Sequence, residues 1–154
     1  DQIRTAMPDV AITTDLMVGF PGETEEDFLC TLRAVEAARF DAAFTFVYSP
    51  REGTVAATMP NQVPEDVKGQ RIRRLIEVVN DSAAASNAAL VGSIQEVMVE
   101  GPSERDSSVM AGRTRTNKMV HWPARAHATA SVPGDILHVR IEQASAYTLR
   151  GVEA

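Results

Sequence analysis

Cysteine is nearly absent from this sequence. The 154 residues include one, Cys30, so the chain has no internal disulfide and cannot build a multi-cysteine metal or iron–sulfur site by itself. No CxxC or HExxH pattern occurs, and we expect no metal ligands. Cys30 lies in a helical pattern without a neighbouring histidine, which predicts an inert, packed thiol.

Long apolar runs are also missing. No stretch of about 18 apolar residues is present that could span a membrane. The start, DQIRTAMPDV, lacks the basic and then apolar pattern of a signal peptide and does not begin with methionine. We therefore expect a cytoplasmic protein from a reducing compartment, and one piece of a longer polypeptide.

Acidic residues are absent from one region, residues 107–134. The first 83 residues account for the whole net charge of −6, and the remainder is balanced. The acid-free region carries two histidines, His121 and His127, and four basic side chains, Arg113, Arg115, Lys118 and Arg125. Such a local positive field predicts an anionic partner.

The first half of the chain reads as alternating strand and helix. Residues 10–18 (VAITTDLMV) are apolar and β-branched, as in a strand covered on both faces. After a turn, Thr24 and Asp27 fit a capping box that opens a helix. Its apolar positions recur at helical spacing: Phe28, Leu32, Val35 and Ala38. Residues 43–48 (AFTFVY) predict a second strand, which completes a βαβ unit with parallel strands.

The second half changes its periodicity. A loop over residues 49–64 precedes a helix that starts at Glu65 and ends near Leu90. Five short β-rich runs follow, over residues 94–100, 109–114, 119–122, 136–143 and 147–152, and predict a small all-β barrel. The predicted fold class is therefore α/β followed by all-β, with domains over residues 1–85 and 86–154. Two strands and two helices cannot close an eight-stranded α/β barrel and could form only its last part.

The turn GFPGE is the first candidate site, because ligands bind at the carboxyl ends of parallel strands. It matches neither phosphate-loop pattern, and Glu23 would repel a phosphate. Phe20 and Pro21 suit a flat apolar partner such as an adenine ring. A βα turn with a helix cap explains the same residues without a ligand.

The segment YSPREGT ends the second predicted strand, on the same rim as GFPGE. Its side chains Tyr48, Ser49 and Arg51 are candidates for contact with a substrate or cofactor. Strand termination and surface capping are the alternative explanation.

The segment GRTRTNKMVHW is the candidate nucleic-acid surface. Arg113, Arg115 and Lys118 can pair with phosphates, while Asn117 and His121 can hydrogen-bond base edges. Trp122 can stack on a base or fill the barrel core, and the core is favoured because a small barrel needs large apolar fillers. His127 and His138 are isolated, and we expect structural or surface roles for both.

These motifs resemble a known family. TTDLMVGFPGETEEDF and AFTFVYSPREGTVAA resemble the C-terminal portion of the radical S-adenosylmethionine domain of methylthiotransferases, a partial TIM-like barrel. GRTRTNKMVHW and PGDILHVRI resemble the RNA-binding TRAM domain, a small OB-like barrel, that ends those enzymes.

The resemblance implies an enzyme that adds a methylthio group to C2 of N6-dimethylallyladenosine beside the tRNA anticodon. It implies S-adenosylmethionine and two [4Fe–4S] clusters as cofactors, the anticodon arm of tRNA as partner, and an N-terminal part outside this sequence. None of the cluster cysteines is present, so this chain alone is expected to be inactive, with no catalytic residue and no metal ligand of its own. A non-catalytic RNA-binding module remains an alternative, as do methylthiotransferases acting on threonylcarbamoyl-adenosine or on a ribosomal protein.

By the same resemblance, two sets of residues are predicted to bind ligands. The cofactor set is Gly19, Phe20, Pro21, Gly22, Glu23, Tyr48 and Ser49. The RNA set is Arg113, Arg115, Asn117, Lys118 and His121.

Overall fold

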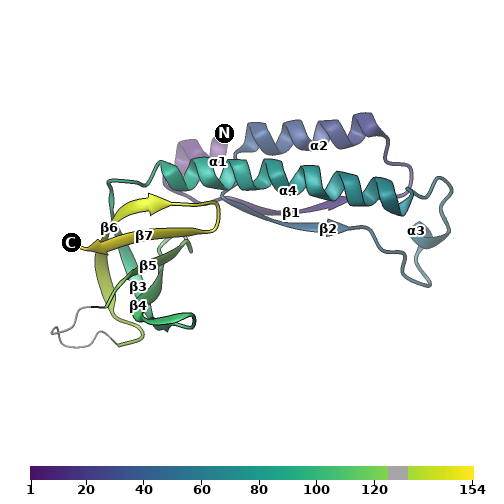
Figure 1. The fold of residues 1–154 in the computed structure, drawn as a ribbon. Helices are drawn as coiled ribbons and strands as arrows, with labels where there is room; N and C mark the ends of the chain where they lie inside the picture. The colour runs from purple at the N-terminus through teal and green to yellow at the C-terminus, as the bar shows by residue number, and fades with distance from the viewer. Residues whose placement is uncertain (125–131) are drawn as a thin grey trace. The chain divides into compact units, whose positions relative to one another are not determined.

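A computed structural model describes residues 1–124 and 132–154 of the chain (Figure 1). They form two compact units: one is Ile12–Ser82, and the other combines Asp1–Ala11 with Ala83–Ala154. Along the chain, the division between the units falls between Ser82 and Ala83, and the sequence analysis places the domain boundary after residue 85. In the described part of the chain, no helix has the length and apolar character needed to cross a membrane.

The first unit is built on two parallel strands, β1 (Thr13–Val18) and β2 (Ala42–Val47). Helix α2 (Glu25–Ala38) connects them, and helix α4 (Glu65–Ala88) follows β2. Val18, Phe28 and Leu75 are fully buried, and they come from β1, α2 and α4 respectively. Both helices therefore pack on the same face of the strands, and the predicted βαβ unit is confirmed.

The opposite face of these strands is exposed in the described structure. Met17 is 52% exposed, Phe44 73% and Phe46 47%. Met17 pairs with Phe46, so these side chains project from the same side of the pair. The expectation that residues 10–18 form a strand covered on both faces is therefore wrong for the described residues, because the two helices cover only one.

Helix α2 starts where the sequence predicts. The Thr24 hydroxyl accepts a hydrogen bond from the Asp27 amide at 3.1 Å, and Asp27 Oδ2 accepts one from the Thr24 amide at 3.0 Å. This capping box satisfies backbone N–H groups that have no partner within the helix. Cys30 lies on the same helix but is exposed, with Arg33 Nη2 2.9 Å from its sulfur, so the prediction of a packed thiol is wrong.

Between β2 and α4, the long loop contains a single turn of helix, α3 (Val55–Thr58), which the sequence did not predict. The short helix α1 (Gln2–Ala6) near the N-terminus was not predicted either. Helix α4 itself begins at Glu65, as predicted.

The second unit contains a closed five-stranded barrel, as predicted. Its strands are β3 (Ile94–Ser103), β4 (Asp106–Thr114), β5 (Met119–Pro123), β6 (Ile136–Ala144) and β7 (Thr148–Glu153). Their order around the barrel is β3-β4-β5-β7-β6, and β6 pairs with β3 to close it. The core consists of Val97, Val99, Val120, Trp122, Val139, Ile141 and Leu149.

Candidate cofactor loop and nucleic-acid surface

The GFPGE turn directly follows β1 and depends on glycine. Gly19 and Gly22 have φ angles of 78° and 88°, which side-chain-bearing residues rarely adopt. A Cβ atom on Gly19 would lie 2.5 Å from Cγ of Lys68, on α4. Glycine is therefore required here both for the turn and for the close approach of α4.

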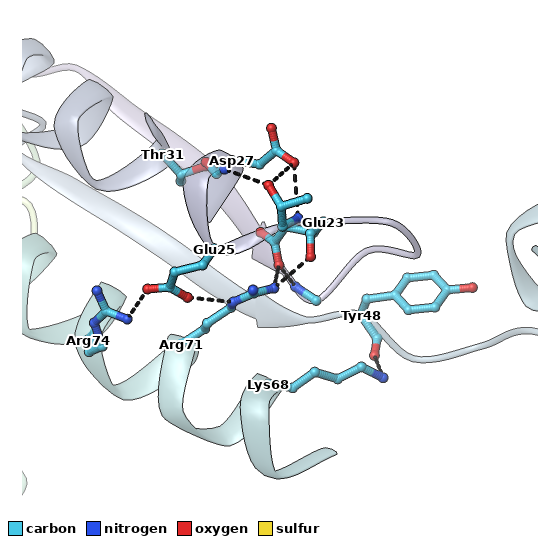
Figure 2. A network of polar contacts seen from close by, with 10 residues as sticks. Glu23, Glu25, Asp27, Thr31, Tyr48, Lys68, Arg71 and Arg74 are labelled. Atoms are coloured by element: carbon cyan, nitrogen blue, oxygen red, sulfur yellow. Dashed lines mark hydrogen bonds and ion pairs between the residues drawn. The ribbon is translucent and has the colours of Figure 1, made fainter. Parts of the chain in front are cut away.

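Glu23 holds this turn in place (Figure 2). Its Oε2 accepts a hydrogen bond from the Gly19 amide at 2.6 Å and pairs with Arg71 Nη1 at 2.8 Å. Arg71 also donates to the Glu23 carbonyl at 3.1 Å. Both side chains are largely buried, so Glu23 joins the two ends of the turn to α4 within the protein.

A second carboxylate extends this network. Glu25 pairs with Arg74 at 2.6 Å and with Arg71 Nε at 3.5 Å (Figure 2). The hydrogen bond from Arg74 lowers the pKa of Glu25 below its ordinary value. The guanidinium groups of both arginines also lie over the Phe28 ring. The start of α2 is thus fixed to α4 by charged groups above an aromatic ring.

Phe20 and Tyr48 lie at the carboxyl ends of β1 and β2, on the rim that these parallel strands share. Their rings meet edge to face with centroids 5.2 Å apart. Tyr48 is buried, and its hydroxyl has no hydrogen-bond partner in the described structure. Its carbonyl accepts a hydrogen bond from Lys68 Nζ at 3.3 Å, while Ser49 and Arg51 are exposed. The structure thus brings Gly19, Phe20 and Tyr48 together, as expected for strand ends that share a rim.

A hollow of about 420 Å³ lies beside the same turn. Gly22, Glu23 and Thr24 line one side of it, and Arg71 lines another. Asn61, Gln62, Val63, Pro64 and Val67 complete the lining. Of the predicted cofactor residues only Gly22 and Glu23 contribute, so the predicted set is divided between this hollow and the Phe20–Tyr48 rim.

In the second unit, residues 112–122 form the end of β4, a turn and β5. Asn117 has a φ angle of 62° at the turn. Trp122 is 1% exposed and belongs to the barrel core, which confirms the favoured interpretation. Its ring is therefore not available to stack on a base.

The two arginines of the predicted RNA set have acidic partners on β3. Arg113 Nε lies 2.9 Å from Glu100, and Arg115 Nη1 lies 3.1 Å from Glu96. Because Arg113 pairs with Met98 across the strands, Glu96 and Glu100 lie on either side of its partner. The segment lacks acids in sequence, but β3 supplies them in space. Such exposed ion pairs are worth only about 0–1 kcal/mol.

Asn117 and Lys118 also have partners within the unit. Asn117 Oδ1 accepts from Arg113 Nη1 at 3.2 Å. Lys118 Nζ donates to Asn87 Oδ1 at 2.8 Å and to Ser86 Oγ at 3.2 Å, and both acceptors lie at the end of α4. Lys118 thereby places a positive charge near the negative end of the helix dipole.

His121 is half-buried and pairs with Arg150 on the parallel strand β7. Burial, then the charges of Arg150 and Arg105, lower its pKa below the ordinary value of 6.5. It is therefore neutral at pH 7 and suited to hydrogen bonding. The sequence analysis missed Arg105 and Arg150; alternation along residues 148–153 was the signal available for Arg150. His138 is exposed, as expected, while Arg125 and His127 lie outside the described residues.

Comparison with protein families gives one match, the TRAM domain, over residues 88–152. This span contains β3 to β6 and nearly all of β7. Residues 88–152 are a TRAM domain. The TRAM domain predicted by resemblance is thus confirmed, and its first residue lies at the end of α4.

Curated relatives extend the similarity beyond the TRAM domain. The chain is 52% identical over 151 residues to the tRNA-2-methylthio-N(6)-dimethylallyladenosine synthase of Thermoanaerobacter sp. (strain X514), covering 98% of this chain and 31% of the relative. The synthase of the same name from Akkermansia muciniphila is 50% identical over 98% of this chain and 32% of the relative. The synthase of the same name from Moorella thermoacetica is 49% identical, over 97% of this chain and 33% of the relative.

The predicted resemblance to methylthiotransferases is therefore confirmed over both units, since nearly every residue of the chain is aligned. The chain spans about a third of the length of the curated relatives it matches.

Proposed function

We propose that this chain is the C-terminal part of a tRNA methylthiotransferase that adds a methylthio group to C2 of N6-dimethylallyladenosine beside the anticodon. The observation that carries the proposal is an identity of about half over nearly the whole chain to synthases named for this product. These relatives favour neither a threonylcarbamoyl-adenosine nor a ribosomal-protein substrate. The proposal places the protein in the cytoplasm, with the rest of the polypeptide and the tRNA anticodon arm as partners.

The role proposed for the TRAM domain is to hold the anticodon arm. Arg113, Arg115, Asn117, Lys118 and His121 lie on one β-hairpin and its flanks, which supports a shared RNA-binding face. The ion pairs of both arginines are exposed, so exchanging a carboxylate for a phosphate costs little. Lys118 is best suited to a supporting role, because it already bonds to Asn87.

The rim of the first unit fits S-adenosylmethionine in its chemical character. Among the described residues the buried Tyr48 hydroxyl has no hydrogen-bond partner, and Phe20 beside it is 46% exposed. Together they offer one hydrogen bond and an apolar surface. We propose that Gly19, Phe20, Pro21 and Gly22, with Tyr48 and Ser49, contact this cofactor. Glu23 then acts by fixing the loop through Arg71.

The residues of this chain do not fit an iron–sulfur cluster. Cys30 is the single cysteine, it lies on α2 and it neighbours Arg33. We therefore assign the two [4Fe–4S] clusters, one for S-adenosylmethionine and one for sulfur delivery, to the part of the polypeptide outside this sequence. The two α/β strands are correspondingly the last part of a radical S-adenosylmethionine barrel.

Complementation tests the proposed function. The coding sequence with its upstream extension is expressed in a bacterium that lacks its own synthase, and the nucleosides of its tRNA are analysed by mass spectrometry. We expect 2-methylthio-N6-dimethylallyladenosine to appear, and not to appear when only the 154-residue chain is expressed. Methylthiolation of threonylcarbamoyl-adenosine alone, or of no nucleoside, would contradict the proposal.

A further inference from the structure

The outer surface of β5 and β7 carries an arginine, Arg150, that the predicted RNA set omits. Val120 and Trp122 of β5 and Leu149 and Gly151 of β7 are buried in the barrel. The intervening residues, His121 and Arg150, therefore project outward from adjacent strands, where they are register partners.

Arg105 supplies a second exposed positive charge in the same barrel. It lies in the turn between β3 and β4, and its charge acts on His121 together with that of Arg150. Both arginines are exposed. Two acids flank Arg105 in sequence, Glu104 and Asp106. Asp106 accepts hydrogen bonds from the amide and hydroxyl of Ser108 at 2.9 and 2.6 Å.

Arg105 and Arg150 differ from the two arginines predicted from the sequence in their ion pairs. Within residues 1–124 and 132–154, neither Arg105 nor Arg150 has a carboxylate within ion-pair distance, whereas Arg113 and Arg115 each have one. A phosphate that binds Arg105 or Arg150 therefore breaks no ion pair of the described residues. At Arg113 or Arg115 a phosphate must first replace Glu100 or Glu96, and the small cost of breaking these exposed ion pairs makes the two positions the weaker phosphate contacts.

We propose that Arg105 and Arg150, grouped around His121, make the principal phosphate contacts of the TRAM domain with RNA. This inference rests on the proposed function, in which the TRAM domain holds the anticodon arm. The partner is the ribose–phosphate backbone, which the guanidinium groups can bind in a bidentate manner. His121, neutral at pH 7, is placed to hydrogen-bond a ribose hydroxyl beside the bound phosphates.

Salt-dependent binding tests the proposal. The 154-residue chain is titrated into a fluorescent RNA hairpin with an anticodon-arm sequence, at several salt concentrations. We expect the double variant Arg105→Ala/Arg150→Ala to bind at least about tenfold more weakly at low salt, and its plot of log K against log salt to be shallower by about 1.5. Arg113→Ala/Arg115→Ala should lose less on both measures, because its side chains are partly neutralised.

Two further variants separate local contact from other effects. Arg33→Ala/Arg73→Ala removes the same charge from exposed positions on α2 and α4 and should leave the affinity near that of the wild type. Arg105→Lys/Arg150→Lys keeps the charge and should retain most of the salt slope. The circular dichroism spectrum of each variant verifies that it is folded.

The outcomes distinguish this inference from the proposed function. If the wild-type chain binds the hairpin but Arg105→Ala/Arg150→Ala binds equally well with the same slope, the inference is overturned and tRNA binding stands. If Arg33→Ala/Arg73→Ala loses as much affinity as Arg105→Ala/Arg150→Ala, net charge explains the effect and the inference is again overturned. If the wild-type chain does not bind even at low salt, the RNA-binding role in the proposed function fails first.

Discussion

His121 and Trp122 are consecutive residues with opposite environments. Successive side chains of a strand point to opposite faces, so Trp122 enters the core while His121 meets Arg150 on the outside. The composition of the segment does not reveal which of the two faces solvent. The same limit applies to Glu23, whose role in fixing the loop depends on Arg71, 48 residues further along the chain.

His121 should make the barrel sensitive to acid. Its pKa in the folded state is lowered by burial and by Arg150, so below about pH 6.5 the unfolded state binds more protons than the folded state. The contribution of neutral His121 to the free energy of unfolding is therefore fully present above the pKa that His121 has in the unfolded state. This contribution is lost as the pH falls through the lower pKa of the folded state. We expect His121→Gln to lose less unfolding free energy than the wild type between about pH 7.5 and about pH 5, measured by urea denaturation.

The matched control for this experiment is His138→Gln, which removes an exposed imidazole from β6. It should retain the acid sensitivity of the wild type. Equal sensitivity in His121→Gln and the wild type would show that His121 does not titrate differently in the folded state.

At the scale of elements, the barrel depends on close strand approach. Gly112 on β4 and Gly151 on β7 are buried, and a Cβ atom on either would collide with a backbone carbonyl of the neighbouring strand, at Met98 and Arg140 respectively. Gly69 on α4 is different, because the atom nearest to an added Cβ is the end of the Arg73 side chain at 3.7 Å. The same substitution should therefore have opposite effects in the two elements.

We expect Gly112→Ala to destabilise the barrel by about 1–3 kcal/mol, since β3 and β4 must move apart. Gly69→Ala should stabilise α4 by up to about 1 kcal/mol, because alanine loses less backbone entropy than glycine in a helix. Trp122 is the one tryptophan of the chain, so its fluorescence during denaturation reports on the barrel, while circular dichroism reports on the helix. A Gly112→Ala barrel as stable as the wild type would refute the steric argument.

At the scale of the whole molecule, the chain supplies two folded units, each with its own core, but few ligands for metal chemistry. One cysteine is present, and the described residues contain no group of three or more histidine, cysteine or acidic side chains placed to hold a metal ion. The chain matches synthases about three times as long, so we expect the cluster ligands to lie in the part of the polypeptide outside this sequence.

Iron–sulfur reconstitution tests whether this chain lacks the ligands for a cluster. After anaerobic incubation of the 154-residue chain with iron and sulfide, followed by desalting, we expect no visible absorbance of a [4Fe–4S] cluster, because such clusters need several thiolate ligands. Cys30→Ser is the control and should give the same spectrum. A stable brown product that disappears in Cys30→Ser would show that Cys30 does ligate a cluster.

Local patterns in the sequence predicted most of the elements. The capping box of Thr24 and Asp27, the helix starting at Glu65 and the five barrel strands all appear where short-range periodicity and turn residues placed them. The short helix α3 has too few residues to produce a periodic signal. The resemblance to methylthiotransferases likewise follows from contiguous motifs.

The sequence by itself thus determined the order of elements and the family resemblance, since both depend on residues close together in the chain. Only the tertiary structure decided which charges are paired, because strand register brings Glu96 and Glu100 to Arg115 and Arg113, 13 or more residues away. It also placed Lys118 against the end of α4 and Arg150 beside His121. Electrostatic interactions act through space, so the field at the proposed RNA-binding surface depends on the folded arrangement and not on the spacing of residues in the sequence.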